Sequence, residues 1–387
     1  DNYADFILEK RMAKNKTAVM SFLDNLYENT YPVAKKEMND LKKFAKKIDG
    51  LEDLKPWDVA YYTEKLKKEL FDLDEDSLRP YFKSENVVNG VFKIAEKLYG
   101  LTFEKLSDVQ VYHEDVKVYE VKDGDGLHLG VLYEDLYPRE GKRNGAWMNE
   151  LQSQGLIGGE IRRPHVSFTC NLTKSTETKP SLLTYSEVET IFHEFGHCLH
   201  GLLSNCKYTS LGGTSVYWDF VELPSQIMEN WLGEKEALNL FAYHYETGNL
   251  IPEELIEKIN KSKNYMKGTM YIRQLAFGYL DMGFYGEDFE IKDVLSFEQK
   301  IGKKTALLPI PKGVSIACSF GHIFAGGYSA GYYSYKWAEV LEADAFSKFK
   351  EDGIFNKETA KSFKNNILSR GNLEDPMVLY KKFRGRE

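Results

Sequence analysis

The sequence predicts a mainly helical protein with a small β-sheet near the middle of the chain. Apolar residues recur at helical spacing over most of the 387 residues, whereas strand-like alternation is confined to residues 116–171. Two histidines stand four positions apart in His193-Glu194-Phe195-Gly196-His197, and on a helix they would share one face. These observations favour a helical lobe in which a small sheet lies beside a pair of clustered histidines.

Helical patterns cover both ends of the chain. Residues 5–48 predict long amphipathic helices that are interrupted near Pro32, and the lysine-rich stretch 35–47 is expected to be a solvated face. Further helices are predicted over residues 58–71, 86–99, 185–205, 220–247, 252–287, 325–350 and 356–369. The chain contains no evident repeat, low-complexity tract or linker, so residues 1–387 are expected to form one functional region, as one large domain or two lobes.

The strands are predicted around a hairpin. Residues 116–121 and 127–133 alternate in polarity and flank the turn sequence Asp123-Gly124-Asp125-Gly126. Residues 165–171 add a strand before the histidine-containing helix. An extended peptide could pair with the edge strand of such a sheet, because an edge strand has free backbone amide and carbonyl groups.

The helix over residues 185–205 is expected to be largely buried. Thr184 followed by Glu187 forms a capping-box pattern that marks its start. A wide apolar stripe then follows, made of Val188, Ile191, Phe192, Phe195 and Leu199. The alternative is a surface helix with a solvated histidine and glutamate face, but the stripe argues against it. Buried imidazoles need partners, and a metal ion is the natural one.

A catalytic Zn²⁺ usually takes three protein ligands and leaves one position for water. His193 and His197 provide two ligands, and Glu222, 25 residues after the second histidine, is the predicted third. Pro224 is best tolerated in the first turn of a helix, so a helix should begin near residues 219–221 and place Glu222 close to its N-terminal end. Glu194 would then act as general base toward the water.

Several neighbours of these residues have two possible roles. Ser225 and Glu229 share a helical face with Glu222, and either could bind the second nitrogen of a ligand histidine; the alternative for Glu229 is a solvated carboxylate. Cys198 is expected to be a core residue rather than a fourth ligand. His200 is expected to be a partly buried histidine with satisfied hydrogen bonds, the alternative being support of the metal site.

A second group of candidate residues lies between His322 and Tyr335, where glycines alternate with tyrosines. Glycine permits close approach of the backbone to a ligand, and phenols donate hydrogen bonds without carrying charge at neutral pH. This chemistry suits the oxyanion that develops during peptide hydrolysis. For Tyr332 and Tyr333, packing in the core is an equally good interpretation.

Together these motifs resemble the thimet oligopeptidase family of zinc metallopeptidases, in particular its bacterial members. The resemblance extends over essentially the whole chain. The matching segments are residues 193–197, residues 219–231, Gly145-Ala146-Trp147-Met148, residues 319–335 and the closing Phe383-Arg384-Gly385-Arg386-Glu387. Family members are considerably longer, so the resemblance implies that this chain is the C-terminal catalytic part and that an N-terminal lobe is absent. A first residue, Asp1, that is not methionine fits a fragment.

The resemblance implies a zincin-like catalytic lobe of a clamshell metallopeptidase, with a deep channel that admits short peptides. It assigns substrate binding and stabilisation of the tetrahedral intermediate to His322, Tyr328 and Tyr335. The spacing between His322 and Tyr328 is one residue longer than in the mammalian pattern, although the bacterial members share it.

We therefore expect a zinc metallo-oligopeptidase with one Zn²⁺ per chain and Glu194 as general base. One alternative is a metal- and peptide-binding fragment that is inactive without its N-terminal lobe, because that lobe would help exclude water. Another is a structural fragment with a vestigial site, which the intact Glu194 and ligand set disfavour. Endopeptidase and peptidyl-dipeptidase specificities both remain open.

Composition bounds the location and partners of the protein. A net charge of −8 argues against nucleic acid as a partner. No apolar run reaches the ~18 residues that would span a bilayer. The four cysteines form no Cys-x-x-Cys pair and suit free thiols in a reducing compartment. We expect a soluble, cytoplasmic protein.

Overall fold

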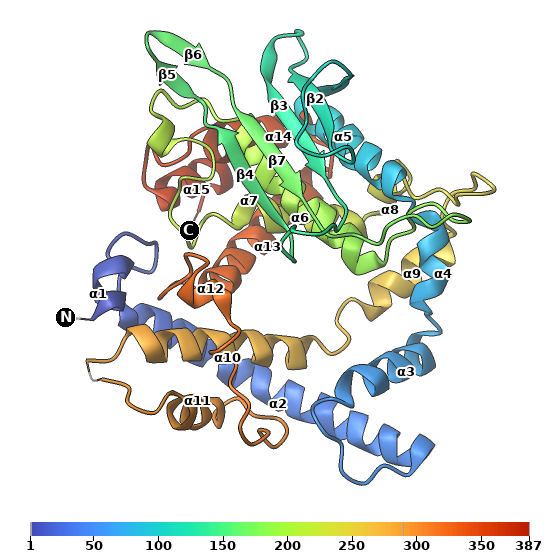
Figure 1. The fold of residues 1–387 in the computed structure, drawn as a ribbon, viewed down its shortest axis with the longest axis vertical. Helices are drawn as coiled ribbons and strands as arrows, with labels where there is room; N and C mark the ends of the chain where they lie inside the picture. The colour runs from blue at the N-terminus through green and yellow to red at the C-terminus, as the bar shows by residue number, and fades with distance from the viewer. Residues whose placement is uncertain (1, 289, 387) are drawn as a thin grey trace. The chain divides into compact units, whose positions relative to one another are not determined.

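The computed structural model describes residues 2–288 and 290–386 (Figure 1), so Asp1 and the final Glu387 of the closing motif lie outside the described residues. The chain divides into two compact units. The first contains residues 1–73 and 257–337, and the second contains residues 74–256 and 338–387. No helix within the described ranges is long and apolar enough to cross a membrane.

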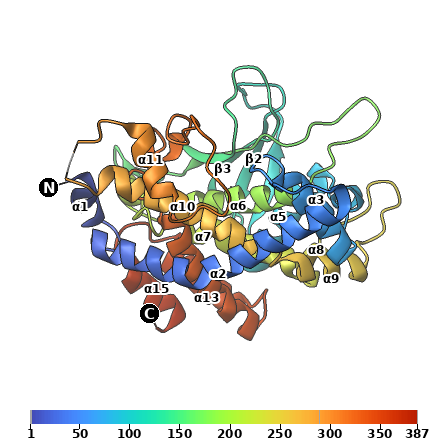
Figure 2. The same ribbon diagram turned by 90° about the horizontal axis from the view of Figure 1, so that it is seen from below.

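The first unit is helical. Its elements are α1 (Tyr3–Leu8), α2 (Lys16–Asp49), α3 (Val59–Phe71), α10 (Lys267–Tyr285), α11 (Val294–Gly302) and α12 (Gly321–Phe324). The long helices α2 and α10 lie side by side (Figures 1 and 2). Their contact forms one core cluster, to which α1 and the segment after α12 also contribute: Ala4, Leu8, Ala13, Val19, Leu23, Ala34, Ile272, Leu275, Tyr279, Met282, Ala330 and Tyr333.

The predicted interruption near Pro32 is wrong, because α2 continues through this residue from Lys16 to Asp49. Pro32 lies on the exposed side of the helix, while Leu23 and Ala34 on either side of it are buried. A proline removes one backbone hydrogen bond from a helix. Burial of the helix against α10 over both halves outweighs that loss.

The second unit contains a five-stranded sheet in the order β1-β2-β3-β7-β4. The strands are β1 (Thr102–Leu106), β2 (Lys117–Lys122), β3 (His128–Asp135), β4 (Trp147–Gln152) and β7 (His165–Thr169). β3 and β7 are parallel, and every other pair is antiparallel, so β1 and β4 form the two edges. The predicted hairpin and the strand from His165 are confirmed, whereas β1, β4 and the separate hairpin of β5 (Gly155–Ile157) and β6 (Glu160–Arg162) were not predicted.

Helices complete the second unit. They are α4 (Glu75–Leu78), α5 (Ser84–Tyr99), α6 (Tyr185–Leu202), α7 (Leu223–Glu229), α8 (Lys235–Leu238), α14 (Lys357–Phe363) and α15 (Pro376–Arg384). Among them, α5 and α6 contact the sheet. Helix α6 packs against β7, β4 and β3 (Figure 1). Its Phe195 contacts Phe168 of β7 and Phe92 of α5. The histidine pair therefore lies on a helix that is held directly against the sheet.

Three long predicted helices are broken in the structure. Residues 220–247 form α7, a 3₁₀ turn and α8, followed by irregular chain. Residues 252–287 divide into α9 (Glu253–Ser262) and α10, separated by a turn in which Met266 has a left-handed φ of 54°. In 325–350, only the part from Ser334 is helical, as α13 (Ser334–Asp352), because Gly327 and Ala330 adopt φ values of 88° and 51°. The predicted class, mainly α with a small sheet, is nevertheless confirmed.

Candidate metal centre

Helix α6 begins at the predicted cap. The Glu187 amide donates to Thr184 Oγ1 at 3.1 Å, and the Thr184 amide donates to Glu187 Oε2 at 2.8 Å, which completes the capping box. The predicted apolar stripe is buried, with each of its five residues at most 1% exposed. This stripe orients α6 so that His193 and His197 project from the opposite side of the helix.

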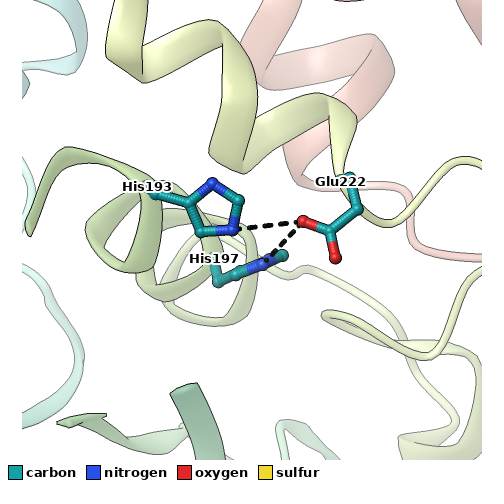
Figure 3. A group of neighbouring side chains, drawn as sticks. All are labelled: His193, His197 and Glu222. Atoms are coloured by element: carbon teal, nitrogen blue, oxygen red, sulfur yellow. Dashed lines mark ion pairs between the residues drawn. The ribbon is translucent and has the colours of Figure 1, made fainter. Parts of the chain in front are cut away.

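The structure brings the three predicted ligands together (Figure 3). The Nε2 atoms of His193 and His197 each lie 3.2 Å from Glu222 Oε2. Glu222 caps the N-terminus of α7, so the carboxylate comes from the helix start that Pro224 indicated. Its side chain is only 3% exposed, and those of the two histidines are 22% and 13% exposed.

This arrangement fits a zinc ion. Two imidazoles and one carboxylate are a donor set that catalytic zinc sites use. With zinc–ligand bonds of about 2.0–2.1 Å, two ligand atoms at tetrahedral positions would be roughly 3.3 Å apart. The observed 3.2 Å between each histidine nitrogen and the Glu222 oxygen is close to that separation.

Electrostatics in the cluster also favour a bound cation. Burial would lower the pKa of His193, but Glu222 and Glu229 outweigh burial and raise that pKa well above its ordinary value. Burial likewise would raise the pKa of Glu222, but His197 and His193 hold it well below its ordinary value. The carboxylates thus draw positive charge to the imidazoles, and a metal ion can supply that charge in place of a proton.

Two residues of α7 support the ligands. His193 Nδ1 lies 2.7 Å from Glu229 Oε1, a contact that orients the ring so that Nε2 faces Glu222. The Ser225 hydroxyl donates to Glu222 Oε2 at 2.9 Å. Of the two roles considered for Glu229, the structure therefore shows the contact with a ligand histidine.

Gly196 permits the close approach of α7 to α6, a role that the sequence analysis missed. A Cβ atom at this position would lie 2.3 Å from the Pro224 carbonyl oxygen and 2.6 Å from Ser225 Cα. Any larger residue would push α7 away and carry Glu222 with it. The available signal was a glycine in the middle of a helix, where this residue is otherwise unfavourable.

Glu194 lies between the two histidines and is 6% exposed. Burial is the main cause that raises the pKa of its carboxyl, and no group in the described part of the chain bonds to its buried Oε2 atom. The residue lines a cavity of about 460 Å³ with His193 and Glu229. The remaining lining comes from the start of α6 and from segments that flank β4 and β7: Gly145, Ala146, Asn171, Leu172, Ser186, Glu187, Glu189 and Thr190.

The predicted tyrosine group belongs to the first unit, where its members lie together. The rings of Tyr328 and Tyr335 stack, with centroids 4.9 Å apart and an interplanar angle of 18°. The centroid of the His322 ring lies 6.0 Å from that of Tyr328 and 6.4 Å from that of Tyr335. Tyr332 and Tyr333 are 7% and 1% exposed, so core packing describes both.

Two further expectations concern α6. Cys198 is completely buried, in agreement with a core role. The expectation of a partly buried and satisfied His200 is wrong. This residue is completely buried, and neither of its ring nitrogens has a hydrogen-bond partner among the described residues. Burial accordingly lowers the pKa of His200 to about 3, so the ring is neutral.

Residues 1–387 match Peptidase family M3, and the chain belongs to this family. Oligopeptidase A of Escherichia coli strain K12 is 46% identical over 100% of this chain and 58% of the relative's length. The dipeptidyl carboxypeptidase of the same organism is 37% identical over 100% of this chain and 57% of its own length. The predicted resemblance to bacterial members is confirmed, and the chain spans little more than half of each relative.

Solved structures agree on the fold. The structure titled "PZ peptidase A with inhibitor 2" superposes with a TM-score of 0.56 at 15% identity, covering 96% of this chain and 55% of that one. An M32 carboxypeptidase from Deinococcus radiodurans R1 gives a TM-score of 0.50 at 14% identity, covering 97% of this chain and 72% of the carboxypeptidase. At these identities the likeness supports the zincin-like architecture alone.

Proposed function

We propose that this chain is the catalytic region of a zinc-dependent metallopeptidase that hydrolyses peptide bonds in short oligopeptides. The observation that carries the proposal is the convergence of His193, His197 and Glu222 beside the buried carboxylate of Glu194. Membership of Peptidase family M3 supports the same class of reaction.

In this proposal His193 Nε2, His197 Nε2 and a Glu222 oxygen hold one Zn²⁺. The ion would supply Lewis-acid activation of water and of the substrate carbonyl. Glu194 accepts the proton of the attacking water and later delivers it to the leaving amine. Its raised pKa suits both steps, because a carboxyl that binds a proton more readily is a better base and can still release the proton.

Peptide binding is assigned to the edge strand β4. Within the described sheet β4 pairs only with β7, so its outer edge can accept an extended peptide through backbone hydrogen bonds. The Asn171 side chain donates to the carbonyls of Arg143 and Gly145, at 2.9 and 2.7 Å, and so fixes the chain that leads into β4. Such recognition reads the backbone of a substrate and accommodates varied side chains.

Stabilisation of the oxyanion is assigned to the phenols of Tyr328 and Tyr335, and substrate binding to His322. The stacked pair presents neutral hydrogen-bond donors on a glycine-rich segment, which supports this assignment. Whether the cut releases a dipeptide or divides the peptide internally depends on how the substrate termini are bound.

A second candidate is a metal- and peptide-binding part that hydrolyses peptides only with an N-terminal lobe. Its support is the length of the relatives, since the chain covers 58% of Escherichia coli oligopeptidase A. Such a lobe would act as a partner that closes the site against water.

The decisive experiment measures hydrolysis of a short internally quenched peptide by the purified chain, with added Zn²⁺ and with a chelator, alongside metal analysis. Glu194→Gln is expected to retain one Zn²⁺ and to lose activity by about 10²–10⁴-fold. Glu189→Gln is the matched control, because it removes the same charge from the same cavity and helix.

Activity of Glu194→Gln within tenfold of wild type would overturn the assignment of the base. Zinc binding without hydrolysis by the wild-type chain would favour the second candidate. The masses of the products would separate endopeptidase cleavage from dipeptide release.

A further inference from the structure

The backbone that carries the tyrosine group is irregular. Between α12 and α13 the chain passes through turns in which Gly327 and Ala330 have left-handed φ values of 88° and 51°. A left-handed conformation is unfavourable for alanine, so the surrounding structure must impose it. The question is which contacts hold the segment in this form.

One face of α10 supplies these contacts through Gln274, Phe277, Asp281 and Tyr285, spaced at helical intervals of three and four residues. Gln274 Oε1 accepts from the Tyr332 hydroxyl at 2.9 Å, and the Phe277 ring packs against Tyr332 and Phe320. The Tyr285 hydroxyl donates to the carbonyl oxygen of Ile323 at 2.6 Å.

Asp281 makes the central contact. Its Oδ1 accepts from the Ala330 amide at 2.7 Å, and its Oδ2 accepts from the Tyr332 amide at 2.9 Å. One bond holds Ala330, the left-handed residue, and the other holds the residue two positions further along; backbone amides grouped in this way form an anion-binding concavity. The carboxylate therefore fixes the backbone of residues 330–332.

Burial makes this contact unusual. Asp281 is 0% exposed, and no cationic side chain of the residues that the structure describes forms an ion pair with it. A buried carboxylate is costly unless hydrogen bonds compensate it. Here the compensation comes from the backbone of the tyrosine segment, so the carboxylate and the conformation of that segment depend on each other.

We propose that Asp281 is a positioning residue for catalysis, which holds the backbone of residues 330–332 and thereby aims the phenols of Tyr328 and Tyr335. Tyr328 lies two residues before Ala330, and Tyr335 lies three residues after Tyr332. The inference rests on the function proposed above for these two tyrosines. Asp281 itself acts through the backbone and does not touch the reacting atoms.

The test uses the full chain with Asp281→Asn, which keeps the shape of the side chain but places an amide donor against one of the two backbone amides. We expect kcat to fall by about 10²-fold with little change in KM, because small displacements of catalytic groups cost about this much. Hydrogen exchange at the Ala330 and Tyr332 amides should accelerate. Bound zinc should remain at one per chain.

The matched control is Asp24→Asn. Asp24 also bonds to α10, accepting from the Tyr279 hydroxyl at 2.7 Å, but it does not contact the tyrosine segment. This variant should keep kcat within threefold of wild type, and the exchange rates of Ala330 and Tyr332 should be unchanged. An equal loss in both variants would mean that kcat merely follows the stability of the first unit, and would overturn the proposal.

Unchanged kcat in Asp281→Asn, with or without faster exchange, would also overturn it. If Tyr328→Phe and Tyr335→Phe both retain wild-type kcat, the function assigned to the tyrosines fails instead. The exchange rates then still show whether Asp281 holds the turn, so the two failures are distinguishable.

Discussion

The ligand cluster on α6 and α7 and the tyrosine segment 321–335 differ in what holds them. The predicted ligands lie on or at the end of two packed helices, and their contacts link residues of α6 with residues of α7 and its N-cap. The tyrosine segment is irregular between α12 and α13, and it depends on contacts from α10, in which Asp281 lies 49 and 51 residues before its partners. A site built on regular helices can be recognised from spacing, whereas a site built on an irregular segment depends on distant partners.

The largest effect expected within this comparison is from Tyr335→Phe. Removal of one oxyanion donor should lower kcat by about 10²–10³-fold, because such a donor acts mainly in the transition state. Steady-state kinetics with a short quenched peptide would measure it. Tyr333→Phe is the control, since that residue is 1% exposed and packs in the core. A decrease of less than threefold for Tyr335→Phe would remove the tyrosine segment from the catalytic machinery.

Gly196→Ala tests whether the cluster depends on the close approach of two helices. The added methyl would meet the Pro224 carbonyl, so the free energy of unfolding should fall by about 1–3 kcal/mol, and zinc affinity should fall with it. Denaturant unfolding and zinc titration would measure these changes. Gly124→Ala is the control, because its nearest neighbour would be in ordinary contact at 3.7 Å. Unchanged zinc affinity would show that Glu222 adjusts independently of α7.

Glu229→Gln tests the support behind His193. Loss of the charged partner should weaken zinc binding by about 10–100-fold, as is typical of residues that orient metal ligands. Competition with a chromophoric chelator would measure the affinity. The same substitution at the exposed Glu236 of α8 should have no effect. Equal zinc affinities of Glu229→Gln and wild type would mean that helix geometry alone orients the imidazole.

A separate effect, on stability rather than on activity or zinc binding, is a pH dependence that arises from the tyrosine segment. Burial raises the pKa of Asp281 to about 7, against 3.8 for an ordinary aspartate. Between these pH values the unfolded chain loses this proton while the folded chain keeps it. The free energy of unfolding should therefore fall as pH rises from 4 to 7, by up to about 1.4 kcal/mol per pH unit, and level off above 7.

Unfolding of wild type and Asp281→Asn at several pH values would isolate this contribution, because the variant lacks the titrating group. Parallel pH profiles for the two proteins would mean that the backbone amides keep Asp281 charged throughout. The tyrosine segment would then be held by a fixed charge, as the ligand cluster is.

The sequence predictions succeeded where local patterns decide the structure and failed where contacts with distant segments decide it. The capping box of α6 and the convergence of His193, His197 and Glu222 were predicted, because the cap and the histidine pair depend on spacings of a few residues and Pro224 indicated a helix start beside Glu222. The continuity of α2 through Pro32 was not predicted, because a distant helix packs against it. The edge strand β4 was missed because its residues alternate weakly, with no fully buried position among them.

The sequence by itself determined the helical class, the central hairpin, the candidate residues of the metal centre and the resemblance to a peptidase family, since each is encoded in short-range periodicity or in a local motif. Only the tertiary structure decided that Gly196 lets α7 approach α6, that Glu229 contacts His193, and that Asp281 holds the turn at Ala330. The physical reason is that close approach and burial arise between segments that no local pattern brings together. The sequence names the candidate groups, and packing determines where their side chains point.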